Sequence, residues 1–199
     1  MPPLRLGAIV LAAGGSSRMG RTKQLLELEG KPLVVRAVEA VLGSGADPVV
    51  VVLGHDAESV RAPIARHRVL AVLNPDWSSG LASSIRAGLS ALLGASPGLD
   101  AVLVALCDQP ALSADVIGRL ADLHRATGRI AAARYGGRNG APAVFGRDHF
   151  DALNALAGDG GARALLNGDP EKVAAVDLPS LGFDLDTPPD LSEWANRHP

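Results

Sequence analysis

Short apolar runs rich in valine and leucine alternate with longer stretches of mixed polarity along the first two thirds of the chain. A continuous apolar run of this length, bounded by polar residues, is typical of a strand that is buried on both faces. The pattern therefore predicts strands over residues 6–11, 48–53, 69–73, 101–106 and 129–133, of which 6–11 and 48–53 are expected to be buried.

The stretches between these runs have the apolar spacing of amphipathic helices. Pro32 stands at a favourable first helical position, and Asp56 and Ser113 are suitable helix caps. Helices are expected over residues 33–41, 56–66, 81–93 and 114–126. Strands that alternate with helices in this way form βαβ crossovers, so we expect an α/β fold with three layers and a mainly parallel, Rossmann-like sheet.

The rhythm changes after Tyr135. Residues 136–142 predict a turn-rich excursion that ends at the apolar residues 143–145. A helix over about residues 148–157, a shorter one through Leu166, a strand over 172–177 and a terminal helix are expected to follow. Because no internal repeat or linker is visible, residues 1–199 are predicted to form one domain.

Composition narrows the classes of function. The net charge of −2 gives no reason to expect nucleic acid or an anionic membrane as a partner. A lone Cys107 excludes an intramolecular disulfide and is expected to be a small buried side chain. Since no signal peptide or membrane-spanning stretch is visible, the expected location is the cytoplasm.

The loop after the first predicted strand carries the clearest candidate chemistry. From Leu11 to Lys23 it reads LAAGGSSRMGRTK. Glycines let a backbone approach a ligand closely and turn its N–H groups toward phosphate oxygens. Arg18 and Lys23 add the positive charge that a triphosphate requires. The combination predicts a nucleoside triphosphate site.

Two other phosphate-binding motifs fit this loop less well. The frame from Gly15 to Thr22 suits a Walker loop, but Arg21 stands where that motif requires lysine. A dinucleotide fingerprint requires a spacing that Gly14, Gly15 and Gly20 do not have. It also requires an acidic residue about twenty positions further on, which the chain lacks at the end of a second strand.

Asp108 is the candidate metal ligand. It follows directly after the predicted strand 101–106 and Cys107, at the sheet edge where ligands bind in open parallel sheets. Mg²⁺ prefers one or two carboxylates together with phosphate oxygens and water, so few protein ligands are expected. A plain solvated turn residue before Pro110 is the competing interpretation.

The loop resembles the L-x-A-G-G-x-[ST]-x-R-M-G-x-x-K element of nucleotidyltransferases, in particular of the enzymes that attach a nucleotide to the molybdenum cofactor. The resemblance extends to residues 74–88, 107–110, 140–145 and 158–163 and to the final Asp-Thr-Pro, and so covers nearly the whole chain. The Ala12-Ala13-Gly14 sequence is similar to the cytidylyl-transferring type. Cys107 and Leu11 depart from the glycine and threonine that are frequent at these places.

The resemblance implies that the phosphate of molybdopterin attacks the α-phosphorus of CTP and that pyrophosphate leaves. Arg18, Lys23 and Asp108 are the implied catalytic residues, and Asp108 and Asp186 the implied ligands of Mg²⁺. The excursion after Tyr135 is the expected place for the phosphorylated pterin acceptor. The expected nucleotide-binding residues are Leu11, Ala12, Ala13, Gly14, Gly15, Ser16, Ser17, Gly20, Asn74, Ser78, Gly80 and Ser83.

Several other activities remain open at this point. A guanylyltransferase of the same family, or a cytidylyltransferase for another small phosphorylated or sugar acceptor, uses the same donor chemistry. An accessory protein that delivers the cofactor to a molybdenum hydroxylase, the further implied partner, needs the same binding sites. An NAD(P)-binding oxidoreductase is the alternative from another class, and the missing ribose-binding acid argues against it.

Overall fold

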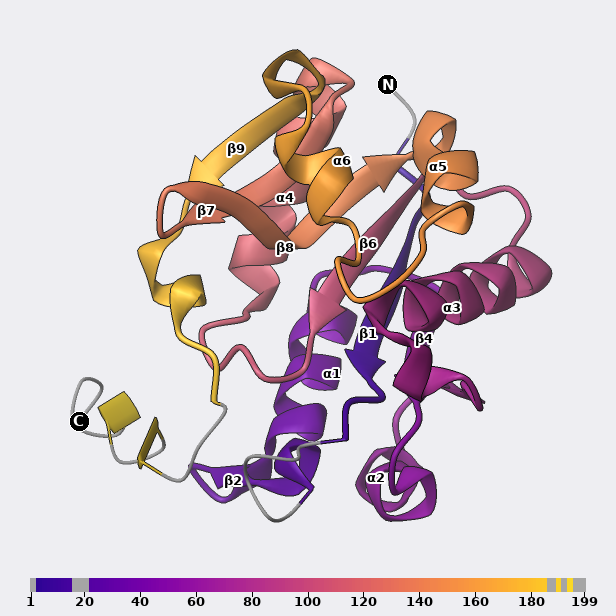
Figure 1. The fold of residues 1–199 in the computed structure, drawn as a ribbon, viewed down its shortest axis with the longest axis vertical. Coiled ribbons are helices and arrows are strands. Elements are labelled where there is room, and N and C mark those ends of the chain that lie inside the picture. The colour runs from indigo at the N-terminus through magenta and orange to yellow at the C-terminus, as the bar shows by residue number, and fades with distance from the viewer. Residues whose placement is uncertain (1–2, 16–21, 186–188, 191–192, 195–199) are drawn as a thin grey trace.

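The computed structural model describes residues 3–15, 22–185, 189–190 and 193–194. Its centre is a seven-stranded sheet with the strand order β5-β4-β1-β6-β8-β7-β9 (Figure 1). The strands are β1 (Leu6–Ala12), β4 (Val49–Leu53), β5 (Leu70–Leu73), β6 (Ala101–Leu106), β7 (Ile130–Tyr135), β8 (Arg138–Gly146) and β9 (Val173–Asp177). Two further short strands, β2 (Glu27–Leu28) and β3 (Lys31–Pro32), form a separate ribbon.

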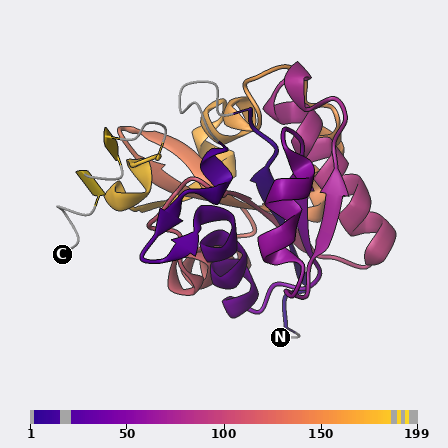
Figure 2. The ribbon, with the colours of Figure 1, turned by 90° about the horizontal axis from the view of Figure 1, so that it is seen from below.

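Helices cover both faces of this sheet, as Figure 2 shows from below. They are α1 (Leu33–Gly43), α2 (Ala57–Ile64), α3 (Leu81–Ala95), α4 (Ala114–Thr127), α5 (Phe150–Asn154) and α6 (Arg163–Asn167). One apolar core joins α1, α2 and α4 to the sheet, and another joins α3, α5 and α6 to its other face. Along β1, Val10 belongs to the first core, whereas Ile9 and Leu11 belong to the second. Since both faces are covered, the central strands β1, β4 and β6 are buried almost throughout, which confirms the three-layer α/β prediction. The edge strand β5 differs, because its Leu70 and Leu73 are 44% and 52% exposed.

The sheet is parallel except at β8, which runs antiparallel to both of its neighbours. The expected turn-rich excursion over residues 136–142 is wrong, because most of it lies in β8 and pairs with β7. Gly136 and Gly137 alone form the turn, with φ values of 55° and 73°. Two left-handed residues in a row are the requirement of a tight two-residue hairpin, and glycine meets it without strain.

Two local predictions also differ from the structure. The helix expected over residues 148–157 is a 3₁₀ turn, Arg147–His149, followed by the short α5. Asp56 adopts a left-handed conformation with φ of 52° and makes no capping bond to α2. Its carboxylate instead accepts a 2.7 Å hydrogen bond from Thr22 Oγ1. Ser113, by contrast, caps α4 through Val116 N–H as predicted.

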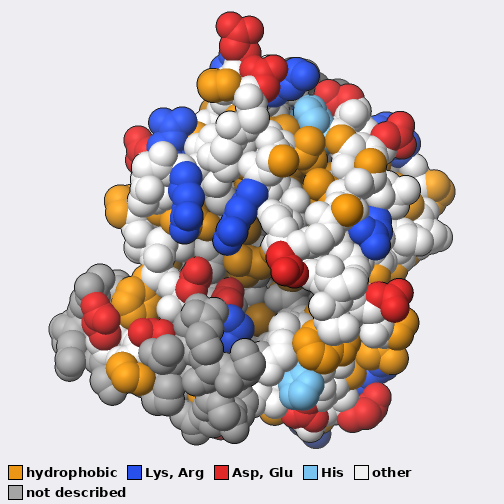
Figure 3. Space-filling view, in the orientation of Figure 1, with side chains coloured by type: hydrophobic (Ala, Val, Ile, Leu, Met, Phe, Trp, Pro, Cys, Tyr) orange, Lys and Arg blue, Asp and Glu red, His pale blue; other side chains and the backbone are white. Residues whose placement is uncertain are grey.

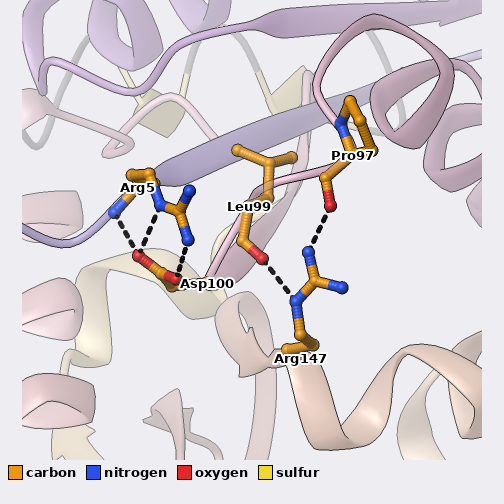
Figure 4. A network of polar contacts seen from close by, with 5 residues as sticks. All are labelled: Arg5, Pro97, Leu99, Asp100 and Arg147. Atoms are coloured by element: carbon orange, nitrogen blue, oxygen red, sulfur yellow. Dashed lines mark hydrogen bonds and ion pairs between the residues drawn. The ribbon is translucent and has the colours of Figure 1, made fainter.

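Two arginines fix the edge of the sheet at which β1 and β6 begin (Figure 4). Arg5 binds both carboxylate oxygens of Asp100, and its Nη2 lies 2.8 Å from Oδ1. Arg147 donates to the carbonyl oxygens of Pro97 and Leu99, which belong to the loop before β6. These contacts hold the entry to β6 at the end of the sheet opposite the glycine loop. In the described part of the chain, no helix has both the length and the apolar character needed to cross a membrane.

Candidate functional site

The glycine loop and Asp108 follow two strands that lie side by side. Strand β1 pairs with β6 in parallel, with Leu11 opposite Leu106 (Figure 1). Both strands therefore end at the same edge, where open α/β sheets bind their ligands. The structure thus brings together two candidate segments that are about a hundred residues apart in sequence.

Lys23 and Asp108 form an ion pair at this edge. Lys23 Nζ lies 2.5 Å from Asp108 Oδ2, and the two side chains are only 17% and 15% exposed. Lys23 is placed there by a 3₁₀ turn, Lys23–Leu25, that follows the glycine loop. A part-buried pair of this kind is screened less by solvent and salt than a surface pair.

The second oxygen of Asp108 is available for a cation. Among the residues that the structure describes, Asp108 Oδ1 is buried and has no hydrogen-bond partner. Burying a carboxylate oxygen without a hydrogen-bond partner costs free energy, and a bound cation offsets this cost. The described segments contain no group of three His, Cys, Asp or Glu side chains placed to hold a metal ion. Asp108 therefore fits a cation that takes most of its ligands from phosphate and water, as Mg²⁺ does.

Gln24 is a site residue that the sequence analysis missed. Its side chain is only 1% exposed, and its Nε2 donates to Ala12 O at 3.1 Å and to Gly14 O at 2.8 Å. The carbonyl between them, Ala13 O, accepts from His55 N–H at 3.1 Å. The sequence shows only a glutamine directly after Lys23, and no motif or spacing rule marks that position as part of a site.

These contacts turn the start of the glycine loop into an anion cradle. Three successive carbonyl oxygens, those of residues 12–14, point toward protein donors. Within the described residues, no backbone bond uses the N–H groups of Gly14 and Gly15. Since peptide dipoles whose carbonyls are held inward present their N–H groups outward, this stretch suits phosphate oxygens.

Trp77 supports the same loop from the side. A Cβ atom on Gly15 would lie 2.9 Å from Cζ3 of Trp77, and one on Gly54 would lie 2.6 Å from its Cβ. The His55 ring lies against the indole, with centroids 5.4 Å apart. Glycine is required at both positions because only a bare backbone can approach the indole this closely. The geometry favours loop support over stacking on a ligand.

The loop after β5 is tied together by its own polar side chains. Asn74 is 3% exposed, and its Nδ2 donates to the hydroxyls of Ser83 and Ser84. Ser83 donates in turn to Gly80 O at 2.8 Å. Gly80 has φ of 112° and directly precedes the first residue of α3. The side chain of Ser78 is exposed. The structure thus uses the Asn74 and Ser83 side chains to shape the loop beside the cradle.

Of the remaining candidate residues, Ser16, Ser17, Arg18, Gly20 and Asp186 lie outside the described residues. Cys107 is buried as expected. Burial raises the pKa of the Cys107 thiol to about 12, and the negative charge of Asp108 adds to this effect. A thiol of this kind stays protonated and is a poor nucleophile or metal ligand.

A cavity adjoins the cradle on the side of α3, α6 and β8. Its aliphatic floor comes from strand residues of the second core, and its rim carries arginine and asparagine side chains. Figure 3 shows charged side chains of both signs gathered around a hollow on this face. The residues that line the cavity are Leu11, Leu81, Ile85, Val104, Leu106, Tyr135, Arg138, Asn139, Gly140, Ala141, Ala143, Phe145, Gly160, Ala162, Arg163, Leu166, Asn167 and Asp184.

The chain is similar to proteins of more than one described activity. Nicotine blue oxidoreductase from Paenarthrobacter nicotinovorans is 40% identical over 193 residues, which are 90% of this chain and 91% of the relative. Purine catabolism protein PucB from Bacillus subtilis is 31% identical over 190 residues, with the same coverage of 90% and 91%.

A solved structure has the same fold. Rv0371c from Mycobacterium tuberculosis superposes with a TM-score of 0.82 at 29% identity, covering 97% of this chain and 98% of that one. A second crystal structure of Rv0371c is a complex with manganese. The MobA-like NTP transferase domain matches residues 8–178, a span that includes the glycine loop, Lys23 and Asp108. This chain belongs to the family of MobA-like NTP transferase domains.

Proposed function

We propose that this chain moves CMP from CTP onto the phosphate of molybdopterin and releases pyrophosphate. The observation that carries the proposal is the Lys23–Asp108 pair at the end of a cradle whose carbonyls are held inward. Membership of an NTP transferase family supports the donor half of the reaction. The choice of cytosine and of the pterin rests on the resemblance of the loop and of the later segments.

The residues of the site suit nucleotidyl transfer. A phosphate oxygen of the acceptor attacks the α-phosphorus, the bond to the β-phosphate oxygen breaks, and pyrophosphate leaves with the electron pair. Such a transfer depends on positioning and on charge neutralisation more than on covalent chemistry by the protein. The N–H groups of Gly14 and Gly15 would bind phosphate oxygens, while Lys23 and Arg18 would neutralise the charge that develops on the leaving group.

Asp108 is the residue that would hold a divalent cation, with Asp186 as the second proposed ligand. The buried Oδ1 of Asp108 fits this role, and the manganese complex of Rv0371c supports a divalent ion in the family. When bound with the nucleotide, Mg²⁺ would neutralise phosphate charge. Lys23 bonds Asp108 Oδ2 in the structure, so phosphate and carboxylate would share this ammonium group.

The test is pyrophosphate release measured with each of the four nucleoside triphosphates, with and without molybdopterin. We expect release with CTP only when molybdopterin is present. Lys23→Met should abolish it, whereas Lys31→Met, which removes a surface lysine paired with Glu39, should not. Release with GTP alone among the nucleotides would assign the guanylyl reaction, and release with another phosphorylated acceptor would replace molybdopterin.

An oxidoreductase is the second candidate, because a relative 40% identical over nearly the whole chain carries that name. The glycine loop lacks a dinucleotide spacing, which argues for the transferase. Titration of CTP and of NADPH against the fluorescence of a Trp194→Phe variant, in which Trp77 beside the loop is the one remaining tryptophan of the sequence, distinguishes the two. Quenching by NADPH but not by CTP would favour the oxidoreductase. Tight binding of molybdopterin without turnover would favour a delivery protein for a molybdenum hydroxylase.

A further inference from the structure

Two arginines face the cavity beside the cradle without an acidic partner. Arg138 is the first residue of β8 and Arg163 is the first residue of α6, so they come from opposite walls. Within the described residues, neither guanidinium forms an ion pair, whereas Arg5, Arg36 and Arg125 each bind a carboxylate. Two guanidinium groups against the one carboxylate of Asp184 leave the cavity lining with a net positive charge, which favours an anionic ligand because arginine binds carboxylate and phosphate bidentately.

The interior of the same cavity is apolar. Leu11, Val104 and Phe145 form its floor together with Ala143, and all four belong to the core under α3 and α6. The apolar carbon that a ligand can reach comes mainly from Leu81, which is 38% exposed, and from the half-buried Leu106, both of which also line the cavity. A floor of aliphatic and aromatic carbon offers no hydrogen bonds, so it favours a flat ring face over a sugar or a peptide.

The two walls are joined firmly. Asn139 N–H donates to Asn167 Oδ1 at 3.0 Å, and Asn167 Nδ2 donates back to Asn139 O at 3.0 Å. The side-chain amide of α6 thus pairs with the backbone of β8 as a neighbouring strand would. Asn139 Nδ2 adds a 2.8 Å bond to Leu166 O. Because these bonds already fix α6 against the hairpin, the cavity is preformed and a ligand need not order it.

We propose that this cavity binds the acceptor by two features: a planar ring system on the apolar floor, and an anionic group on that ring held between Arg138 and Arg163. This second anion is distinct from the phosphate that reacts, which must reach the Lys23–Asp108 edge. Asp184 also lines the cavity and would direct the anion toward the arginines by repulsion. The inference rests on the proposed function, because it assigns the cavity to the acceptor and not to the nucleotide.

The experiment uses 8-anilinonaphthalene-1-sulfonate, a planar apolar anion whose fluorescence rises in apolar surroundings. We expect saturable binding at one site on the folded protein, retained in the presence of saturating CTP. Arg138→Gln and Arg163→Gln should each weaken binding at least about tenfold, the scale of one lost charged hydrogen bond. Arg125→Gln is the matched control, since Arg125 lies on α4 and pairs with Asp122. It should leave binding unchanged.

A third variant tests the floor without altering charge. Ala162→Leu places a larger side chain at a buried cavity residue and should reduce the number of dye molecules bound, while a cooperative thermal unfolding transition shows that the variant is folded. Equal dye affinity in the two arginine variants and the wild type would overturn the inference, as would displacement of the dye by CTP. Failure of the proposed function has a different signature: CTP does not bind, or pyrophosphate is not released, whatever the dye does.

Discussion

Gln24 offers the sharpest test of how the cradle is held. Replacing it by leucine keeps the buried volume but removes the Nε2 donor from Ala12 O and Gly14 O. The buried Ala12 carbonyl costs about 1–3 kcal/mol when it loses its donor, and the part-buried Gly14 carbonyl, which water can reach, costs about 1 kcal/mol, so we expect a loss of about 2–4 kcal/mol in the free energy of unfolding. For a domain of this size, that lowers the melting temperature by about 5–15 °C.

The same change should weaken nucleotide binding separately. Without Gln24, the backbone at Gly14 and Gly15 must be ordered when the phosphates bind, at about 1–2 kcal/mol for each residue. CTP affinity measured by calorimetry should therefore fall at least about tenfold.

The matched control is the other glutamine of the chain. Gln109 is also buried, and its Nε2 donates to Tyr135 Oη, Ala141 O and Leu181 O. Gln109→Leu should lower stability by a similar amount but leave CTP affinity, measured without Mg²⁺, within about twofold of the wild type, because none of its acceptors belongs to the cradle. If the two variants lose CTP affinity equally, the effect is general destabilisation, and the argument for Gln24 as a positioning residue fails.

Three further predictions concern charge, base choice and pH. Asp108→Asn should fold normally but lower turnover about a hundredfold at saturating Mg²⁺, the scale of one lost electrostatic element, and unchanged turnover would remove Asp108 from the site. The wild type should prefer CTP over GTP about tenfold in kcat/KM, and Ala13→Gly should narrow that ratio; a wild-type preference for GTP contradicts the cytidylyl assignment. Hydrogen bonds from Arg5 lower the pKa of Asp100 to about 2, below its usual 3.8. The stabilisation is therefore complete above about pH 4 and is lost as the pH falls toward 2, so urea midpoints of wild type and Asp100→Asn should differ at pH 6 and converge across that window.

The elements that could be predicted from the sequence are those whose signals are local. The run Leu6–Ala12 is apolar throughout because both faces of β1 are covered, and the glycines that follow it mark the loop. Lys23 and Asp108 could be named as candidates because each stands directly beside such a signal. Their pairing could not be deduced, since it depends on β1 and β6 being neighbours in the sheet.

Other features depend on contacts that no local pattern encodes. Gln24 is a site residue only because its amide reaches carbonyls 10 and 12 positions back along the chain. Asp56 resembles a helix cap in sequence, but the Thr22 hydroxyl binds its carboxylate. The Gly136-Gly137 dipeptide is a known hairpin signal, and the strand before it was predicted, but the glycine, proline and polar residues at the start of β8 conceal the second strand of that hairpin.

The position of Gln109 shows how the two halves of the site are coupled. It follows Asp108 at the end of β6, and its amide bonds Ala141 O in β8 and Leu181 O near the carboxyl end of the described chain. The strand end that carries the proposed metal ligand is thus fixed to the wall of the cavity that we assign to the acceptor. Transfer between two bound substrates requires their reacting atoms to be held within a few tenths of an ångström, and one rigid residue shared by both sites provides this.

The cradle is built from backbone and requires little more than glycines, whereas the cavity wall is built from side chains of distant segments. We therefore expect substitutions on that wall to change the acceptor while the nucleotide site stays intact.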